Sequence, residues 1–198
     1  MTPKGIAVRP ELNTEFLLIR HAPIAQQGRL FGRSDVDAAL PAAPIRLPTG
    51  FEKAQRIISP ARRCRQTAAW LWPDGQGIAE QPAFWEQDFG AWEGMALGDI
   101  PDLGPLGRAD LAAHCPPQGE SFNDLVVRVA AGLRSISAAG PVVVIAHAGV
   151  IRAALGLALG DGAQGLVFAV DPLSMTRISR HGENWRIGSV NESSRGVV

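Results

Sequence analysis

Two histidines stand at the ends of apolar runs, in positions where their side chains could do chemistry. His21 follows residues 16–19 with Arg20 between them, and His147 follows residues 141–146. An imidazole ring can act as a nucleophile or as a hydrogen-bonding group near neutral pH. A neighbouring guanidinium group remains charged and matches the oxygens of an anion with its planar N–H groups. The pattern favours a local anion site.

Two further segments carry residues that suit the same site. Arg62 and Arg63 come shortly after an apolar run at 56–58, and Glu86 follows a weaker run at 78–82. A carboxyl group can give a proton to a leaving group and later take one from water. An acid or base therefore accompanies the cationic residues.

The segments that hold these residues alternate between strand and helix patterns. Apolar runs typical of buried strands occur at 16–19, 56–58, 78–82 and 141–146. Ser59 and Pro60 predict the N-cap and first turn of a helix that ends before Pro73. Further helices are expected at 122–136, where Ser121 and Asp124 resemble a capping box, at 149–159, and near 108–114.

This order of elements predicts an α/β fold, a three-layer α/β/α sandwich with a mostly parallel central sheet. The tail adds predicted strands near 166–170, 175–179 and 185–190, and residues 1–13 are expected to form a loosely held arm. Residues 1–198 are expected to form a single domain, with 84–119 as an irregular, lid-like excursion. Because the carboxyl ends of parallel strands meet at one sheet edge, the candidate residues should converge there.

The composition excludes several other classes of partner. The formal net charge is zero, which gives no basis for binding nucleic acid or membrane lipid. Cys64 and Cys115 lack the spacing of a metal site and are predicted to be reduced thiols. Residues 1–15 lack a signal peptide's apolar stretch, and His147 and Arg152 interrupt the apolar run at 142–159. We expect a cytoplasmic monomer or homodimer with no membrane span.

Four ordered segments resemble the histidine phosphatases and cofactor-dependent phosphoglycerate mutases. Each alone would be a weak signal, but their order over residues 16–160 makes the resemblance specific. The segments are LIRHAP at 18–23, SPARRCRQT at 59–67, EQDFGAWEG at 86–94 and VVIAHAGVIR at 143–152. Among the family members, the loop GRLFGRSD at 28–35 and the short chain are similar to alpha-ribazole phosphatase-like proteins.

The resemblance implies a phosphohistidine mechanism and a role for each candidate. His21 would attack phosphorus through a neutral ring nitrogen. Arg20, Arg63 and His147 would bind the non-bridging oxygens and stabilise the charge of the transferring group. Glu86 would protonate the leaving alkoxide and then activate water. The family implies no metal and no cofactor. The motif selects Arg63, and not Arg62, as the phosphate ligand.

The sequence departs from the family pattern in three places. Alanine replaces the usual glycine at Ala22 and Ala148. The threonine and asparagine of the first loop are absent, and Gln27 is a replacement that could donate to phosphate. The usual helix after that loop is missing, and a proline-rich stretch at 41–50 takes its place. Gln27, Arg33 and Ala148 are the predicted substrate-binding residues.

The function predicted from these residues is hydrolysis of a small phosphate monoester by a metal-independent phosphatase. Two alternatives remain open: phosphoglycerate mutase-type phosphoryl transfer, and a non-catalytic module that binds a phosphorylated ligand. The presence of Glu86 argues against the module, because binding alone does not need an acid.

Overall fold

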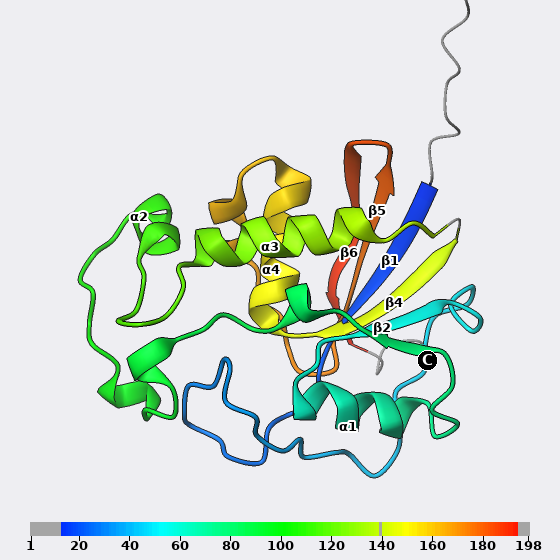
Figure 1. Ribbon diagram of the computed structural model, residues 1–198, viewed down its shortest axis with the longest axis horizontal. Helices are drawn as coiled ribbons and strands as arrows, with labels where there is room; N and C mark the ends of the chain where they lie inside the picture. The colour runs from blue at the N-terminus through cyan, green and yellow to red at the C-terminus, as the bar shows by residue number, and fades with distance from the viewer. Residues whose placement is uncertain (1–12, 139, 194–198) are drawn as a thin grey trace, which may run out of the picture.

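A computed structural model of the protein describes residues 13–138 and 140–193 (Figure 1). A six-stranded sheet has the strand order β3-β2-β4-β1-β5-β6. Its strands are β1 (Asn13–Arg20), β2 (Gln55–Ile58), β3 (Ile78–Glu80), β4 (Pro141–Ala146), β5 (Met175–His181) and β6 (Asn184–Glu192). Strands β3, β2, β4 and β1 pair in parallel. Strand β5 pairs antiparallel with β1, and β6 pairs antiparallel with β5. The predicted, mostly parallel sheet is confirmed.

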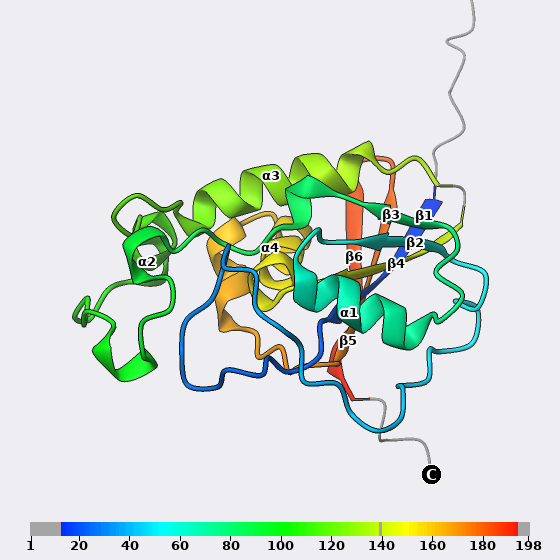
Figure 2. The ribbon, with the colours of Figure 1, turned by 60° about the horizontal axis from the view of Figure 1, so that its bottom comes forward.

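The strands alternate between two apolar cores, which makes the three layers. Phe16 and Leu18 of β1 belong to one core, whereas Leu17 and Ile19 belong to the other. Alternation follows from the two-residue period of a strand. Helices α3 (Phe122–Ser135) and α4 (Ala148–Leu159) cover the first core, and α1 (Arg62–Leu71) covers the second. Figure 2 shows α1 and α3 on opposite sides of the sheet.

Local sequence signals explain where the two long helices begin and end. Ser121 accepts a hydrogen bond from the backbone N–H of Asp124, and Asp124 returns one to Ser121, so α3 starts with the predicted capping box. Helix α4 ends at Gly160, whose φ of 76° is the left-handed conformation that glycine adopts without strain. None of the helices in the described ranges is long and apolar enough to cross a membrane.

The structure corrects two expectations about the elements, and a third falls almost wholly outside the described residues. Helix α1 starts at Arg62 with Ala61 as its N-cap, and not at Ser59. The Ser59 hydroxyl accepts the backbone N–H of Ala61, just before the helix, and also contacts His147. The strand predicted at 166–170 is wrong: Gly162–Val167 is a 3₁₀ helix packed against α4. The arm predicted at 1–13 lies outside the described residues, except Asn13, which begins β1.

The segments 41–50 and 84–119 are both largely irregular, but they differ in their local structure and position. Residues 41–50 contain no helix, as their prolines predict, and Ile45 and Leu47 pack on the core beside α1. Residues 84–119 contain two short 3₁₀ turns and one helix, α2 (Arg108–Ala113). Figure 1 shows α2 at the end of the molecule away from β1 and β6. The 84–119 segment follows β3 and the 3₁₀ turn Pro82–Phe84, carries Glu86 near its start, and ends just before α3.

Candidate active site

The parallel register of the central strands places both site histidines side by side. Arg20 pairs with Ala146 at the ends of β1 and β4, and the backbone N–H of His21 donates to the carbonyl of Ala146 over 2.9 Å. The rings of His21 and His147 consequently lie 5.1 Å apart, edge to face at 66°. The prediction that these strand ends converge is confirmed.

His21 is held as a neutral ring with one nitrogen left for chemistry. Its Nδ1 lies 2.6 Å from the carbonyl oxygen of Ala22, so Nδ1 carries the proton and donates it. Burial, and then the charge of Arg63, lower the pKa of His21 to about 3. The Nε2 atom therefore has a free lone pair at neutral pH, which is the form that a nucleophile requires.

Thr67 joins the His21 loop to helix α1. Its hydroxyl accepts a hydrogen bond from the backbone N–H of Ala22 over 3.0 Å and donates to the carbonyl of Arg63 over 2.7 Å. The buried Thr67 side chain thus links Ala22, whose carbonyl binds His21, to the first turn of α1, which carries Arg63.

Arg63 and His147 form one buried hydrogen-bonded unit. Nε of Arg63 donates to Nδ1 of His147 over 3.2 Å, so Nε2 of His147 carries the proton and donates to the hydroxyl of Ser59 over 2.8 Å. Burial, followed by the Arg63 charge, lowers the pKa of His147 well below its ordinary value. His147 is thus neutral, and both of its ring nitrogens already have partners.

The remaining contacts of Arg63 fix the loop that faces it. Nη1 donates to the carbonyl of Ser34 over 2.9 Å and Nη2 to that of Gly32 over 2.7 Å. Among the described residues, these bonds and the one to His147 use three of the five N–H groups of an arginine. The other two are available to an anion in the cavity that Arg63 lines.

Glu93 organises the same loop from its outer side. Its carboxylate accepts hydrogen bonds from the backbone N–H groups of Gly32, Arg33 and Ser34 at 2.8–3.1 Å, and from the Ser34 hydroxyl at 2.6 Å. Burial acts to raise the pKa of Glu93, but these bonds outweigh it and lower the pKa. An ionised Glu93 therefore fixes the loop whose Gly32 and Ser34 carbonyl groups bind Arg63.

Glu86 enters the site from the irregular segment after β3. Its side chain is buried, and Oε2 accepts a hydrogen bond from the backbone N–H of Gly149 over 3.0 Å. Gly149 lies in the first turn of α4, where backbone N–H groups are free to bind a carboxylate. The other oxygen, Oε1, accepts from the N–H of Gln87 over 3.0 Å.

A cavity of about 610 Å³ brings these groups together. It is lined by Arg20, His21, Arg63 and Glu86, and also by Gln27 and Ala148, two of the predicted substrate-binding residues. Nη1 of Arg20 donates to the carbonyl of Val170 over 2.6 Å, which holds the guanidinium at the cavity wall. His147 lies behind this wall, in contact with Arg63.

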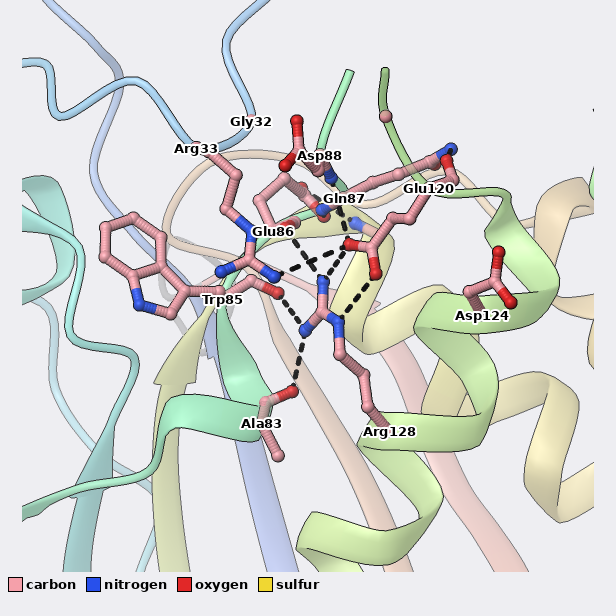
Figure 3. Close-up of polar contacts among 12 residues, drawn as sticks. Gly32, Arg33, Ala83, Trp85, Glu86, Gln87, Asp88, Glu120, Asp124 and Arg128 are labelled. Atoms are coloured by element: carbon pink, nitrogen blue, oxygen red, sulfur yellow. Dashed lines mark hydrogen bonds and ion pairs between the residues drawn. The ribbon is translucent and has the colours of Figure 1, made fainter. Parts of the chain in front are cut away.

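Arg33, the third predicted substrate-binding residue, is not among the residues that line the cavity. Its guanidinium carbon lies 5.6 Å from the centre of the Trp85 ring, and its Nη2 lies 3.8 Å from a Glu120 carboxylate oxygen (Figure 3). Two other arginines, Arg29 and Arg152, line the cavity instead.

The family model of the histidine phosphatase superfamily (branch 1) matches residues 16–193. The chain belongs to the histidine phosphatase superfamily. Membership supports a phosphatase-type function for the cavity. The four segments quoted from the sequence all lie within the matched range.

Solved structures of other proteins share the fold. A mycobacterial glucosyl-3-phosphoglycerate phosphatase is 22% identical over 91% of this chain and 100% of its own, with a TM-score of 0.70. An Escherichia coli protein assigned as an alpha-ribazole-5′-P phosphatase is 20% identical over 93% and 99%, with a TM-score of 0.73. A Thermus thermophilus protein is 28% identical over 82% and 92%, with a TM-score of 0.61. No curated protein matches the sequence.

Several residues of this histidine phosphatase site were not predicted from the sequence to belong to it. Ser59 binds His147, Gly149 binds Glu86, and Arg152 lines the cavity. Ser59 and Gly149 stand inside the quoted motifs, so their position was a usable signal. In the described ranges, no group of three or more His, Cys, Asp or Glu residues is arranged to hold a metal ion.

Proposed function

We propose that this histidine phosphatase hydrolyses a small phosphate monoester through a phosphohistidine on His21, without a metal ion. The observation that carries the proposal is the state of His21: a neutral ring whose Nδ1 is bound to Ala22, at a cavity that Arg20, Arg63 and the Glu86 carboxyl also line. The cavity thus provides a nucleophile, fixed positive charge and a proton carrier.

The first half-reaction moves the phosphoryl group to the protein. Nε2 of His21 attacks phosphorus, the bond between phosphorus and the alcohol oxygen breaks, and Glu86 gives its proton to that oxygen. The developing charge on the other phosphate oxygens is stabilised by Arg20 and by the free N–H groups of Arg63. These positive groups act in place of the metal ions that other phosphoryl-transfer sites use.

The second half-reaction returns the protein to its starting state. Glu86 accepts a proton from a water molecule whose oxygen attacks phosphorus, and the bond from phosphorus to Nε2 breaks. Inorganic phosphate leaves and His21 is neutral again. The hydrogen bond from Nδ1 to Ala22 lasts through both steps and stabilises the positive ring of the intermediate.

His147 acts in this proposal mainly by orienting Arg63. The direct hydrogen bond to phosphate that its sequence position suggested requires Nε2–H to leave the Ser59 hydroxyl. With Nδ1 bound to Nε of Arg63, the ring keeps the guanidinium plane turned toward the cavity.

The walls beyond the phosphate groups favour an alcohol with apolar surface. They include Ile24, Leu30, Phe31, Phe89, Leu97 and Phe122. Leu97 is 57% exposed and lines the cavity, so it is accessible to an apolar group of a substrate. Apolar contact contributes to binding in proportion to the area removed from water. The preferred substrate is therefore a monoester of an apolar alcohol or phenol.

A colorimetric assay tests the proposal. The purified protein should release p-nitrophenol and phosphate from p-nitrophenyl phosphate with EDTA present, and vanadate should inhibit this. Vanadate is a suitable probe because the mycobacterial phosphatase has been crystallised with VO3. His21→Ala should abolish turnover. Activity that depends on an added metal, or that survives in His21→Ala, would contradict the mechanism.

A further inference from the structure

The Glu86 segment is held by an ion pair that the proposed chemistry does not itself use. We propose that Arg128 of α3, with Glu120, is a positioning residue that sets where the Glu86 carboxyl meets the substrate (Figure 3). This inference rests on the proposed role of Glu86 as the acid that protonates the leaving group.

The guanidinium of Arg128 binds three backbone carbonyl groups in the segment that leads to and includes Glu86. Nη1 donates to the carbonyl of Ala83 over 2.8 Å and to that of Trp85 over 2.6 Å. Nη2 donates to the carbonyl of Glu86 itself over 2.8 Å. Figure 3 shows the guanidinium surrounded by these carbonyl groups on one side and by Glu120 on the other.

Glu120 completes the arrangement from the opposite end of the segment. Its carboxylate pairs with Nε and Nη2 of Arg128, and Oε1 also accepts the backbone N–H of Asp88 over 2.9 Å. The backbone N–H of Glu120 donates to the carbonyl of Asp88, and the Gln87 side chain donates to the carbonyl of Glu120. Glu86 thus lies between backbone groups that are bound on both sides.

The segment needs such partners because it has no regular secondary structure. Residues 85–89 belong to no helix or strand, so no neighbouring ladder satisfies the carbonyls of Trp85 and Glu86. Arg128 and Glu120 are 20% and 17% exposed, so water is largely excluded from their contacts. Hydrogen bonds of charged groups are stronger than neutral ones, and more so away from water.

Arginine suits this position better than lysine. All five N–H groups of Arg128 meet acceptors, two on Glu120 and three on the backbone. A lysine ammonium has three donors and no planar fork. The backbone of Glu86 is therefore fixed by Arg128 while its carboxylate is fixed by Gly149. Small displacements of a catalytic group cost large factors in rate.

The test compares two substrates that depend differently on an acid. The p-nitrophenolate of p-nitrophenyl phosphate leaves without protonation, whereas the alkoxide of hexyl phosphate requires a proton. For Arg128→Ala we expect kcat/KM for hexyl phosphate to fall about 100-fold, and that for p-nitrophenyl phosphate to fall less than about fivefold. Arg128→Lys should keep the defect, and Glu86→Gln should show the same substrate pattern more strongly.

Two further variants keep the result interpretable. Arg134→Ala removes an exposed arginine from the same helix, where its ion pair with Glu183 is open to solvent, and should match the wild type. Glu120→Gln keeps the shape of the side chain and replaces Arg128→Ala in the test if that variant does not fold. In Glu120→Gln, kcat/KM for hexyl phosphate should fall about tenfold.

The outcomes separate this inference from the proposed function. An equal loss with both substrates, or no loss, in a folded Arg128 or Glu120 variant would overturn the positioning role and leave the phosphatase assignment standing. A wild-type protein that hydrolyses neither substrate would overturn both. Selective loss with hexyl phosphate supports the positioning role.

Discussion

The backbone N–H of Gly149 donates to Oε2 of Glu86, and the Cα of Gly149 faces the same carboxylate so closely that no side chain fits between them. A Cβ atom on Gly149 would lie 2.2 Å from Oε1 of Glu86 and 2.9 Å from Cδ2 of Leu125. The start of helix α4 therefore binds the carboxylate and also defines the space that it occupies.

Gly149→Ala should displace Glu86 and slow catalysis. The φ of Gly149 is not in the left-handed region, so the steric contact, and not backbone strain, decides the effect. We expect kcat/KM for an alkyl phosphate to fall about 100-fold. Overpacking should cost about 1–3 kcal/mol of unfolding free energy, partly offset by the better helix propensity of alanine.

The matched control for this variant is Gly140→Ala. Among the described residues, no atom beyond the chain neighbours lies within 4 Å of a Cβ added at Gly140, so activity and stability should stay near the wild-type values. Steady-state kinetics and urea unfolding measure both quantities. A Gly149→Ala protein with wild-type activity would show that the carboxylate position is not set by the helix start.

The two buried histidines should make the fold sensitive to acid. The pKa of His21 is about 3 in the folded protein, below its ordinary value of 6.5, and the pKa of His147 is lowered as well. Between pH 6.5 and 3 the unfolded chain therefore binds protons that the folded chain does not. His21 should reduce the unfolding free energy by about 1.4 kcal/mol per pH unit as the pH falls through this range, and the lowered pKa of His147 acts in the same direction.

Urea unfolding at a series of pH values measures this dependence. In His21→Asn the slope between pH 6 and pH 4 should be smaller than in the wild type by about 1.4 kcal/mol per pH unit, because one protonation difference is removed. An unchanged slope would show that His21 takes up its proton in the folded protein over the same range.

The apolar walls of the cavity predict a preference for longer alkyl phosphates. Leaving groups of ethyl, butyl and hexyl phosphate are chemically alike, so the series isolates contact with the walls. We expect kcat/KM to rise about fourfold for each methylene that becomes buried, which corresponds to about 0.8 kcal/mol. Phe89→Ala should flatten the series, whereas Leu111→Ala, an exposed leucine outside the cavity lining, should not. A flat wild-type series would argue for a polar substrate.

The sequence was informative wherever one segment's own pattern decides its structure. Apolar runs predicted β1 and β4, and Ser121 with Asp124 predicted the start of α3. Because the histidines follow those strands directly, the meeting of His21 and His147 could also be predicted. Parallel strands in register bring their carboxyl ends to one edge.

Contacts to the backbone of distant segments could not be predicted in this way. Arg128 is a helical arginine eight residues after Glu120, and nothing in its neighbourhood indicates the carbonyl groups of Trp85 and Glu86. Arg33 has the residue type of a phosphate ligand, but its guanidinium contacts Trp85 and Glu120 outside the cavity lining. Likewise, Gly165 packs closely against the backbone of α4, which favours a 3₁₀ helix over the predicted strand.

A single-turnover experiment tests the central claim, that His21 carries the phosphoryl group. The protein should be mixed in excess with ³²P-labelled substrate, quenched within milliseconds, and digested for peptide mapping. We predict a phosphoprotein that is labile in acid and stable in base, with the label on His21 and absent in His21→Ala. Active turnover with no such intermediate, or with the label on another residue, would contradict the account.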